Sequence, residues 1–139
     1  MRRSKAVRVV VDTNLWVSFL ISGRAPQLDE LLFEGRVKVL FSESLLDELS
    51  LTIRKPKLAK FFAPKAMEEM LTNLNDCIEL VSVSSNVAEC RDPNDDFLLA
   101  LSLDGRADYL LTGDADLLVM KSFRSTRILT LKEFLGLVS

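Results

Sequence analysis

Apolar residues along the chain form short β-branched runs that alternate with longer stretches of helical periodicity. The short runs predict strands at residues 7–11, 37–41, 78–83, 109–111 and 127–129. The helical patterns predict helices over residues 15–21, 28–34, 43–53, 67–74, 95–103 and a short last one after Thr130. Gly23, Gly35 and Pro56 are expected to end the first three of these helices.

This alternation predicts an α/β domain with three layers, α/β/α, around a mainly parallel central sheet of about five strands. The 139 residues suit one domain spanning residues 1–139, and the sequence contains no repeat or linker. In parallel sheets of this kind, ligands bind outside the carboxyl ends of the strands. The residues that directly follow each predicted strand are therefore the first candidates for chemistry.

Composition narrows the class of protein. Hydrophobic residues make up 48% and charged residues 27%, as in globular proteins, and the net charge of −2 gives no overall basic signature of a nucleic-acid binder. No apolar run approaches the roughly 18 residues of a membrane span. The basic start, Met1 to Lys5, is followed only by Val9–Val11 before Asp12 interrupts, which is too short for a signal peptide. We expect a cytoplasmic protein with no membrane contact.

The chain contains no histidine, which removes Ser-His-Asp triads, Cys-His pairs and most zinc-hydrolase geometries. Its two cysteines, Cys77 and Cys90, lie thirteen residues apart without a CxxC pattern, and we interpret them as buried thiols. An enzyme with this composition would work through carboxylates and water, which favours Mg²⁺ or Mn²⁺ as the ion.

Acidic residues recur near the ends of the predicted strands. Asp12 follows the first strand, Asp114 lies three residues after the fourth, and Asp95 and Asp96 open the helix before it. Glu48 lies about two turns into the helix after the second strand. Carboxylates brought together raise each other's pKa values unless a cation neutralises them. Such a cluster is the usual support for one or two Mg²⁺ or Mn²⁺ ions.

Each acid also has a simpler interpretation. Asp12 suits a helix cap, while Asp95 and Asp96 favour the helix dipole. Glu48 alone is typical of a solvated helix residue, and Asp114 is a common turn residue after a glycine. Only their joint recurrence at neighbouring strand ends favours a shared site, because capping does not explain it.

Four segments carry a resemblance to a known family: residues 9–14 (VVVDTN), 44–49 (SLLDEL), 92–100 (DPNDDFLLA) and 107–118 (ADYLLTGDADLL). In this order and spacing they resemble the PIN domain, and the resemblance extends over essentially the whole chain. The nearest likeness is to bacterial and archaeal PIN proteins regarded as toxin components of toxin–antitoxin pairs (VapC-like). The fold implied is a PIN-like three-layer domain.

The resemblance implies roles for individual residues. Four principal acids are implied to hold metal and to carry catalysis, namely Asp12, Glu48, Asp96 and Asp114. Asp116 is implied to hold metal through water, and Asn14 and Thr112 to orient the acids or the attacking water. Asp95 is either a supporting neighbour of these ligands or a competitor of Asp96 for its role.

The activity implied is that of a metal-dependent endoribonuclease that hydrolyses RNA phosphodiester bonds with Mg²⁺ or Mn²⁺. The same resemblance implies a homodimer or higher homo-oligomer, and a small antitoxin protein that inserts near the acidic site. Four aromatic residues are candidates for partner contacts and equally for the core: Trp16, Phe19, Phe61 and Phe62.

Basic residues are the remaining candidates for RNA contact. Arg24 or Lys55 is a candidate to meet leaving-group charge. Two basic groups suit either a nucleic-acid backbone or a solvated surface: Arg2, Arg3, Lys5 and Arg8, and then Lys55, Lys57 and Lys60.

Two other functions fit the residues less well. A receiver-like or phosphatase domain for phosphoryl transfer would place its acid pair near the N-terminus and a lysine late in the chain, whereas here the pair is late. A non-catalytic interaction module that kept the fold would be favoured by loss of a principal acid, and all four are present.

Overall fold

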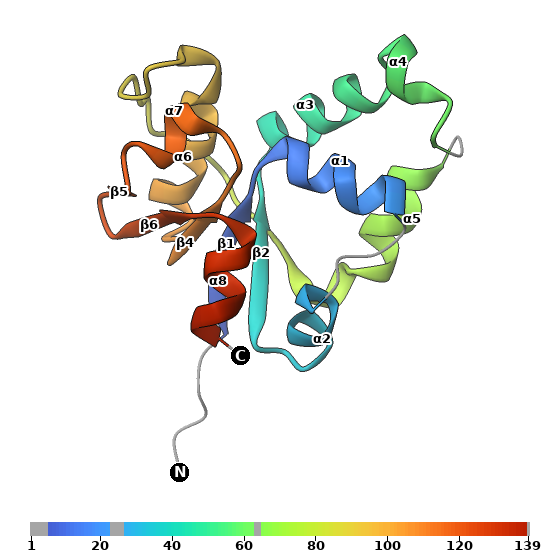
Figure 1. The fold of residues 1–139 in the computed structure, drawn as a ribbon, viewed down its shortest axis with the longest axis horizontal. Helices are drawn as coiled ribbons and strands as arrows, with labels where there is room; N and C mark the ends of the chain where they lie inside the picture. Colours follow the sequence, from blue (N-terminus) through green and yellow to red (C-terminus); the bar gives the residue numbers. More distant parts are fainter. Residues whose placement is uncertain (1–5, 23–26, 63–64, 139) are drawn as a thin grey trace.

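The computed structural model describes residues 6–22, 27–62 and 65–138. It forms a central sheet with helices on both sides (Figure 1), which confirms the predicted α/β/α architecture. The strands are β1 (Val7–Val11), β2 (Val37–Phe41), β3 (Ile78–Leu80), β4 (Tyr109–Leu111), β5 (Ser122–Phe123) and β6 (Thr126–Leu129). Within the described ranges they make one six-stranded sheet in the order β3-β2-β1-β4-β6-β5.

Neighbouring strands are parallel except for β5, which pairs antiparallel with β6 at one edge. The sheet therefore has one strand more than predicted, because the two residues of β5 carry no periodic pattern that sequence inspection can detect. Strand β3 ends at Leu80 rather than Val83; the Val81 N–H still donates to the Phe41 carbonyl of β2 at 2.7 Å, and the chain leaves the sheet after it. The central strand β1 is fully buried at Val9, Val10 and Val11, as both covered faces require.

The helices follow the predicted order with two additions. They are α1 (Thr13–Ser22), α2 (Leu28–Phe33), α3 (Glu43–Ile53), α4 (Pro56–Ala59), α5 (Ala66–Asn73), α6 (Asp96–Asp104), α7 (Ala115–Leu118) and α8 (Leu131–Val138), with 3₁₀ turns η1 (Asn75–Cys77) and η2 (Pro93–Asp95). Helices α4 and α7 were not predicted, because each is a single turn. No helix in the described ranges is long and apolar enough to cross a lipid bilayer.

Local signals in the sequence explain most helix ends. Ser42 caps α3, its hydroxyl accepting a hydrogen bond from the Leu45 N–H at 3.1 Å. Thr130 and Glu133 form the predicted capping box, each side chain accepting from the other's backbone N–H at 3.1 Å. Gly35 follows α2 with a φ of 72°, a conformation that favours glycine. Pro56 begins α4 as well as following α3. Gly23 lies outside the described residues.

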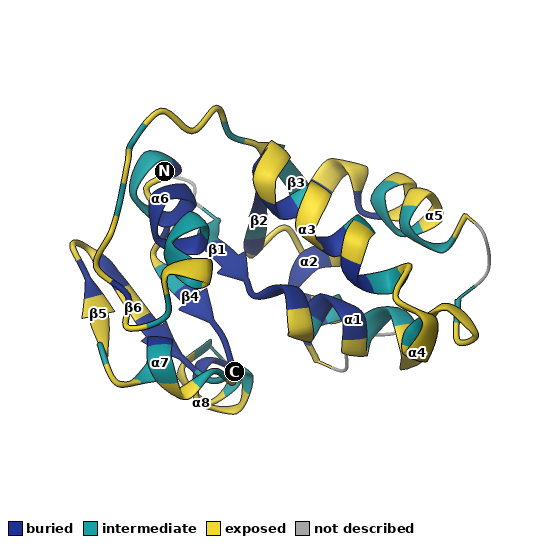
Figure 2. Ribbon diagram, turned by 90° about the horizontal axis from the view of Figure 1, so that it is seen from above, coloured by how far each residue is buried: buried dark blue, intermediate teal, exposed yellow. Residues whose placement is uncertain are grey.

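The two faces of the sheet carry different helices (Figure 2). Paired residues on parallel strands point to the same face, so Tyr109 shares the face of Val9, its partner in β1. Tyr109 contacts Phe134 of α8, with ring centroids 5.3 Å apart. Arg8 points to the opposite face and donates from Nε to the Gly105 carbonyl, directly after α6, at 2.8 Å. Helices α8 and α6 therefore cover opposite faces.

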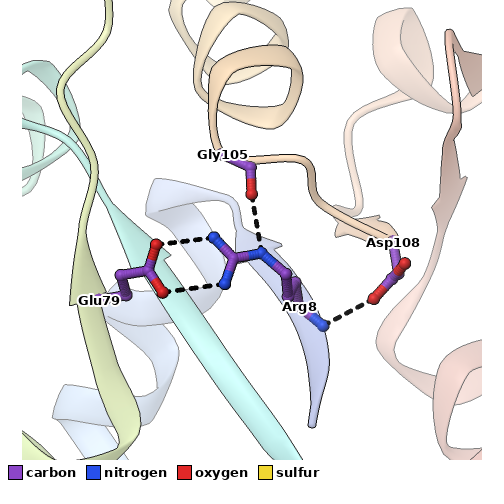
Figure 3. A network of polar contacts seen from close by, with 4 residues as sticks. All are labelled: Arg8, Glu79, Gly105 and Asp108. Carbon is purple, nitrogen blue, oxygen red and sulfur yellow. Dashed lines mark hydrogen bonds and ion pairs between the residues drawn. The ribbon is translucent and has the colours of Figure 1, made fainter. Parts of the chain in front are cut away.

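Arg8 is a structural residue rather than a surface cation (Figure 3). Its guanidinium crosses β2 and makes two hydrogen bonds to the carboxylate of Glu79 in β3, at 2.9 and 2.7 Å. Its backbone N–H donates to Asp108 at 2.9 Å. The bond to Arg8 lowers the pKa of Glu79. This removes Arg8 from the basic group considered for RNA contact; Arg2, Arg3 and Lys5 of that group lie outside the described residues.

The segment from Val81 to Arg91 runs along α6 and is attached near both ends of that helix. Asp104, the last residue of α6, accepts from the backbone N–H groups of Ser84 and Ser85 at 2.7 and 2.9 Å. Asp96, the first residue, accepts from the N–H groups at residues 89 and 90. We call this segment the α6 strap; it links the β3 side of the molecule to the α6 side (Figure 2).

Candidate active site

The candidate site lies where β1 and β4 end side by side in the middle of the sheet. From β1 the strand order continues to β2 and β3 on one side and to β4 and β6 on the other. Successive strands are thus added first on one side of β1 and then on the other. At the point where the strand order reverses, a crevice lies outside the carboxyl ends of the two central strands, and α/β domains bind ligands there. Asp12 follows β1 and Thr112 follows β4, and the Asp12 N–H donates to the Leu111 carbonyl at 2.9 Å.

Asp12 is a buried acid, with 6% of its surface exposed. Its Oδ2 accepts a hydrogen bond from the Thr112 hydroxyl at 2.6 Å, and the backbone N–H groups of Asn14 and Thr13 also bond to its carboxylate. Burial raises its pKa, and the negative charge of Asp114 adds to that shift, while the hydrogen bonds oppose it. Asp12 is thus both a cap for α1 and a carboxylate whose charge meets no positive partner among the described residues.

Asp114 is the N-cap residue directly before α7 and is joined to Asp12 through Thr112. Its Oδ1 caps α7 by accepting from the Asp116 N–H at 2.8 Å. Its own N–H donates to the Thr112 hydroxyl at 3.0 Å. One threonine hydroxyl therefore fixes the positions of the two acids Asp12 and Asp114, which follow the neighbouring strands β1 and β4.

Asp95 completes a cluster with these two acids. Burial, then a hydrogen-bonded contact with the Asp114 carboxyl group, then the charges of Asp114, Asp12 and Asp92 raise the pKa of Asp95 to about 7. Its Oδ2 is buried and has no hydrogen-bond partner within the described part of the chain. An unpaired buried oxygen of this kind costs folding free energy unless a ligand satisfies it.

Asp96, to which the resemblance assigned a principal role, is bonded to the α6 strap, and its part in holding metal stays a prediction. Its Oδ1 accepts from the backbone N–H groups of Glu89 at 3.2 Å and Cys90 at 2.9 Å, so its carboxylate holds the α6 strap. Consecutive helical residues point about 100° apart, so the two adjacent acids face different directions. Of the two, Asp95 is the one whose pKa is raised by the Asp114 and Asp12 charges. A local signal was available: Asp92 accepts from the Asn94 N–H at 3.0 Å, forming the turn η2 and making Asp95 the residue before α6.

Three other predicted residues lie around the cluster. Glu48 is exposed on α3, in a surface hollow that it shares with Asn94 of η2. The Asp116 carboxylate forms an ion pair with Arg91 at 2.8 Å, which leaves it committed to the α6 strap. Asn14 is exposed and contributes its backbone N–H to Asp12.

Both cysteines are free, buried thiols, as predicted. Cys77 donates to the Leu32 carbonyl at 3.3 Å, away from the acids. Cys90 lies on the α6 strap with its sulfur 3.6 Å from the Asp116 carbonyl oxygen, and burial raises the pKa of its thiol. A buried thiol with a raised pKa is a poor nucleophile, so Cys90 is not a candidate catalytic group, and Cys77 is buried away from the acids.

The donor set suits a hard divalent cation. Among the described residues, no three acidic, cysteine or histidine side chains already converge in the arrangement of a finished metal site. Two acids with raised pKa values and one buried unpaired carboxylate oxygen nevertheless provide oxygen ligands that lack a counter-charge. Cations that prefer carboxylate oxygen, such as Mg²⁺ and Mn²⁺, fit this chemistry. These oxygens belong to Asp12, Asp95 and Asp114.

Comparison with known proteins agrees with this geometry. A profile of the PIN domain matches residues 8–116, and the chain belongs to the PIN domain family. The match begins at Arg8 in β1 and ends at Asp116 in α7, so it includes every candidate site residue. PIN domains have a nuclease-type fold and typically use divalent metals.

One curated relative is the uncharacterized protein MJ1680 of Methanocaldococcus jannaschii. It is 28% identical over 118 residues, which cover 83% of this chain and 76% of the relative. Its name assigns no activity, so the function must be argued from the site.

Proposed function

We propose that the protein is a metal-dependent endoribonuclease that hydrolyses RNA phosphodiester bonds at Asp12, Asp95 and Asp114. The observation that carries the proposal is the contact between the Asp95 and Asp114 carboxyl groups beside buried Asp12; burial first, then this contact and the surrounding negative charges, raise the pKa of Asp95 to about 7. Acids with perturbed pKa values gathered in a crevice are more typical of function than of structure. Membership of the PIN family supports the nuclease class.

The chain's own residues supply position and charge. Thr112 orients the Asp12 carboxylate by donating to Oδ2 and also fixes the backbone of Asp114. Asp95 contributes the buried oxygen that lacks a partner. A bound Mg²⁺ or Mn²⁺ would neutralise these acids and promote attack by water on the phosphate. In the net reaction a water oxygen bonds to phosphorus, one ester P–O bond breaks, and the leaving oxygen gains a proton.

Other predicted residues take supporting roles in this proposal. Glu48 approaches the substrate from α3, on the far side of the hollow it shares with Asn94. Asp96 holds the α6 strap, which keeps Asp95 directed at the cluster. The backbone N–H of Asp116 donates a hydrogen bond to the Asp114 carboxylate, while the Asp116 carboxylate pairs with Arg91.

Three exposed lysines are the described cations best suited to an RNA backbone. Lys55, Lys57 and Lys60 lie in and around α4, with their side chains in solvent. Lysines in this setting attract phosphates without reading sequence. Arg24, the other basic candidate, lies outside the described residues.

We further propose that the protein is the toxin of a toxin–antitoxin pair, acting in the cytoplasm as a homodimer or higher oligomer. Support for an antitoxin contact comes from an apolar cavity of about 330 Å³ between α1, α2 and α5, lined by Phe19, Leu20, Phe33 and Met70 among others. Trp16 also lines this cavity but is only 2% exposed, so this residue belongs to the core. Phe61 is exposed beside Lys60. Co-expression with the neighbouring gene and light scattering would test the pair and the oligomer.

Cleavage assays test the nuclease proposal directly. Purified protein is incubated with structured and unstructured RNA in Mg²⁺, Mn²⁺ or EDTA, beside single-stranded DNA of the same sequence. We expect cleavage of RNA with metal, and background levels in EDTA or for Asp12→Asn and Asp95→Asn. Asp76→Asn, in an exposed acid of η1 before β3, is the matched control and should retain activity.

The possible outcomes separate the alternatives. Cleavage that survives both EDTA and Asp12→Asn would refute the metal mechanism. Cleavage of DNA alone would overturn RNA as the substrate. Absence of cleavage in every condition would favour a non-catalytic interaction module.

A further inference from the structure

Arg91, the last residue of the α6 strap, lies close to the acidic cluster. Its Nη2 is 2.8 Å from Oδ1 of Asp116. The backbone N–H of Asp116 in turn donates to Oδ1 of Asp114 at 2.8 Å. Arg91 and Asp114 therefore contact the same residue, one at its side chain and the other at its backbone. Only Asp116 separates the guanidinium from an acid of the cluster.

The backbone that carries Arg91 is attached on two sides. The Cys90 N–H donates to the carboxylate of the first residue of α6 at 2.9 Å. The Cys90 sulfur lies 3.6 Å from the carbonyl oxygen of Asp116 in α7. Asp95 and Asp114 are the residues directly before these two helices. The strap therefore places Arg91 beside the first turns of α6 and α7, where the two acids lie.

The ion pair between Arg91 and Asp116 is open to solvent, so its partner can be exchanged. The Arg91 side chain is 60% exposed and the Asp116 side chain 38%. Such a pair contributes little to stability, because water screens both charges. A guanidinium also makes bidentate hydrogen bonds with phosphate, whose oxygens match its fork of N–H groups. A phosphate that approaches this corner of the site can therefore take the place of Asp116.

The charge distribution around the acids shows why a cation matters at this position. The charges that act on Asp95 are those of three other aspartates, so the cluster repels a polyanion such as RNA until cations offset it. The lysines in and around α4 lie at the far end of α3 from the sheet (Figure 1) and suit a more distant part of the strand. Among the described residues, Arg91 is the cationic side chain whose contacts lead to the acids.

We propose that Arg91 binds the RNA backbone at the phosphate next to the scissile one, and that Asp116 is its resting partner while no RNA is bound. The inference rests on the proposed function, because the acids define which phosphate is scissile. When RNA binds, the guanidinium leaves Asp116 and donates to phosphate oxygens. This exchange frees the Asp116 carboxylate, as its implied role as a water-mediated metal ligand requires. Arg91 positions the strand and takes no part in breaking the ester bond.

Two variants and a control separate phosphate binding from a structural role. Arg91→Gln removes the charge, and Asp116→Asn removes the resting partner. Both break the same ion pair, so both loosen the strap, but only Arg91→Gln removes the phosphate contact. Arg36→Gln makes the same change at an arginine that is 53% exposed and paired with Glu34 at 3.5 Å. Arg36 precedes β2, at the opposite end of the parallel strands from the acids. Thermal unfolding of every variant confirms that it folds.

Binding is measured in EDTA by fluorescence anisotropy of a short, labelled single-stranded RNA over a range of salt concentrations. Arg91→Gln should weaken binding about tenfold at low salt. It should also reduce the slope of log K against log salt by about 0.7, the value for one phosphate contact on a single strand. Asp116→Asn should strengthen binding about threefold, and the gain should vanish when Arg91→Gln is added. Arg36→Gln should bind like the wild type.

Neutral methylphosphonate linkages, placed one at a time along the RNA, locate the contact. For the wild type, the replacement next to the cleavage site should weaken binding about tenfold, whereas Arg91→Gln should show no loss at that position. In cleavage assays with Mg²⁺ or Mn²⁺, Arg91→Gln should raise KM about tenfold and leave kcat nearly unchanged, because the contact is made equally in the ground state and the transition state.

Equal affinity and salt dependence of Arg91→Gln and the wild type would overturn the inference and leave the nuclease proposal intact. The same holds if Asp116→Asn weakens binding as much as Arg91→Gln, since the ion pair would then have only a structural role. Absence of cleavage by the wild type would refute the nuclease proposal instead, and the methylphosphonate series would still decide whether Arg91 contacts a phosphate. Failure of the wild type to bind RNA, with metal or without it, would overturn both.

Discussion

Thr112 donates its hydroxyl hydrogen to Oδ2 of Asp12 across 2.6 Å, although the two residues are 100 positions apart in the chain. The bond joins the ends of β1 and β4 at the centre of the sheet. Because the same hydroxyl accepts from the Asp114 N–H, a single small side chain sets the separation of two candidate metal ligands.

Replacing Thr112 by valine should destabilise the protein by about 1–3 kcal/mol, since the buried Asp12 carboxylate loses a hydrogen-bond donor. Thr112→Ser keeps the hydroxyl and should lose much less. Urea unfolding followed by circular dichroism measures both variants. A valine variant as stable as the wild type would show that another group takes over the bond.

The raised pKa of Asp95 predicts how the metal-free protein responds to pH. Because the folded state holds this proton more tightly than the unfolded state, whose Asp pKa is near 3.8, stability should fall as pH rises from about 4 to about 7. Asp12 contributes in the same direction. Asp95→Asn should flatten this dependence and stabilise the metal-free protein at pH 8 by on the order of 1 kcal/mol, after allowance for solvent screening. Unfolding curves in EDTA between pH 4 and 8 provide the test; an unchanged pH slope in the variant would contradict it.

Metal binding should depend on the same proton. A cation competes with the proton on Asp95, so Mn²⁺ should raise the melting temperature more at pH 8 than at pH 6. Differential scanning fluorimetry with and without Mn²⁺ measures the shift. Asp95→Asn should reduce it at both pH values, whereas Asp76→Asn should show the wild-type response. A larger shift at pH 6 would refute the competition.

Asp96→Asn separates the two adjacent acids. If Asp96 holds the α6 strap, its amide variant should lose about 1 kcal/mol of stability through weaker bonds to the Glu89 and Cys90 N–H groups. It should keep most of the stabilisation by Mn²⁺, unlike Asp95→Asn. Asp104→Asn, at the other attachment of the strap, is the matched comparison. Loss of the Mn²⁺ response in Asp96→Asn alone would return the principal role to Asp96.

The ion pair of Arg8 and Glu79 should contribute measurably, because their side chains are only 30% and 44% exposed and the pairing is bidentate. Glu79→Gln is expected to cost about 1 kcal/mol above pH 5, less at high salt. The pKa of Glu79 is lowered, so this contribution is lost as pH falls through its folded value. Glu34→Gln, in a 3.5 Å pair that is more exposed, should have no measurable effect. Equal costs for both variants would contradict this ranking.

Much of the fold could be predicted from the sequence because its signals are local and strong. The β-branched runs specify β1 and β2, and Ser42 and Thr130 specify helix starts that the structure confirms. The missed elements, β5, α4 and α7, contain two, four and four residues, too few for a periodic pattern to arise. Strand β3 was predicted three residues too long, because Val81 and Val83 continue the alternation of apolar and polar residues beyond the last paired residue, Leu80.

The site was predictable in location but not in the orientation of each acid. Asp12 and Asp114 follow adjacent parallel strands, so sequence order and topology alone bring them together. The choice between Asp95 and Asp96 depends on where η2 ends and α6 begins, a difference of one residue that changes the direction of the side chain. Arg8 was misassigned to a basic surface, because its partner Glu79 is 71 residues away and no local pattern pairs them.

The strand order divides the molecule at the boundary between β1 and β4. Strands β1 to β3 come from the chain before the α6 strap and strands β4 to β6 from the chain after it. Asp12 and Glu48 belong to the first half, whereas Asp95 and Asp114 belong to the second. A growing chain therefore has no complete acidic cluster until β4 has left the ribosome and paired with β1. The acids of the two halves therefore meet only through the pairing of β1 with β4.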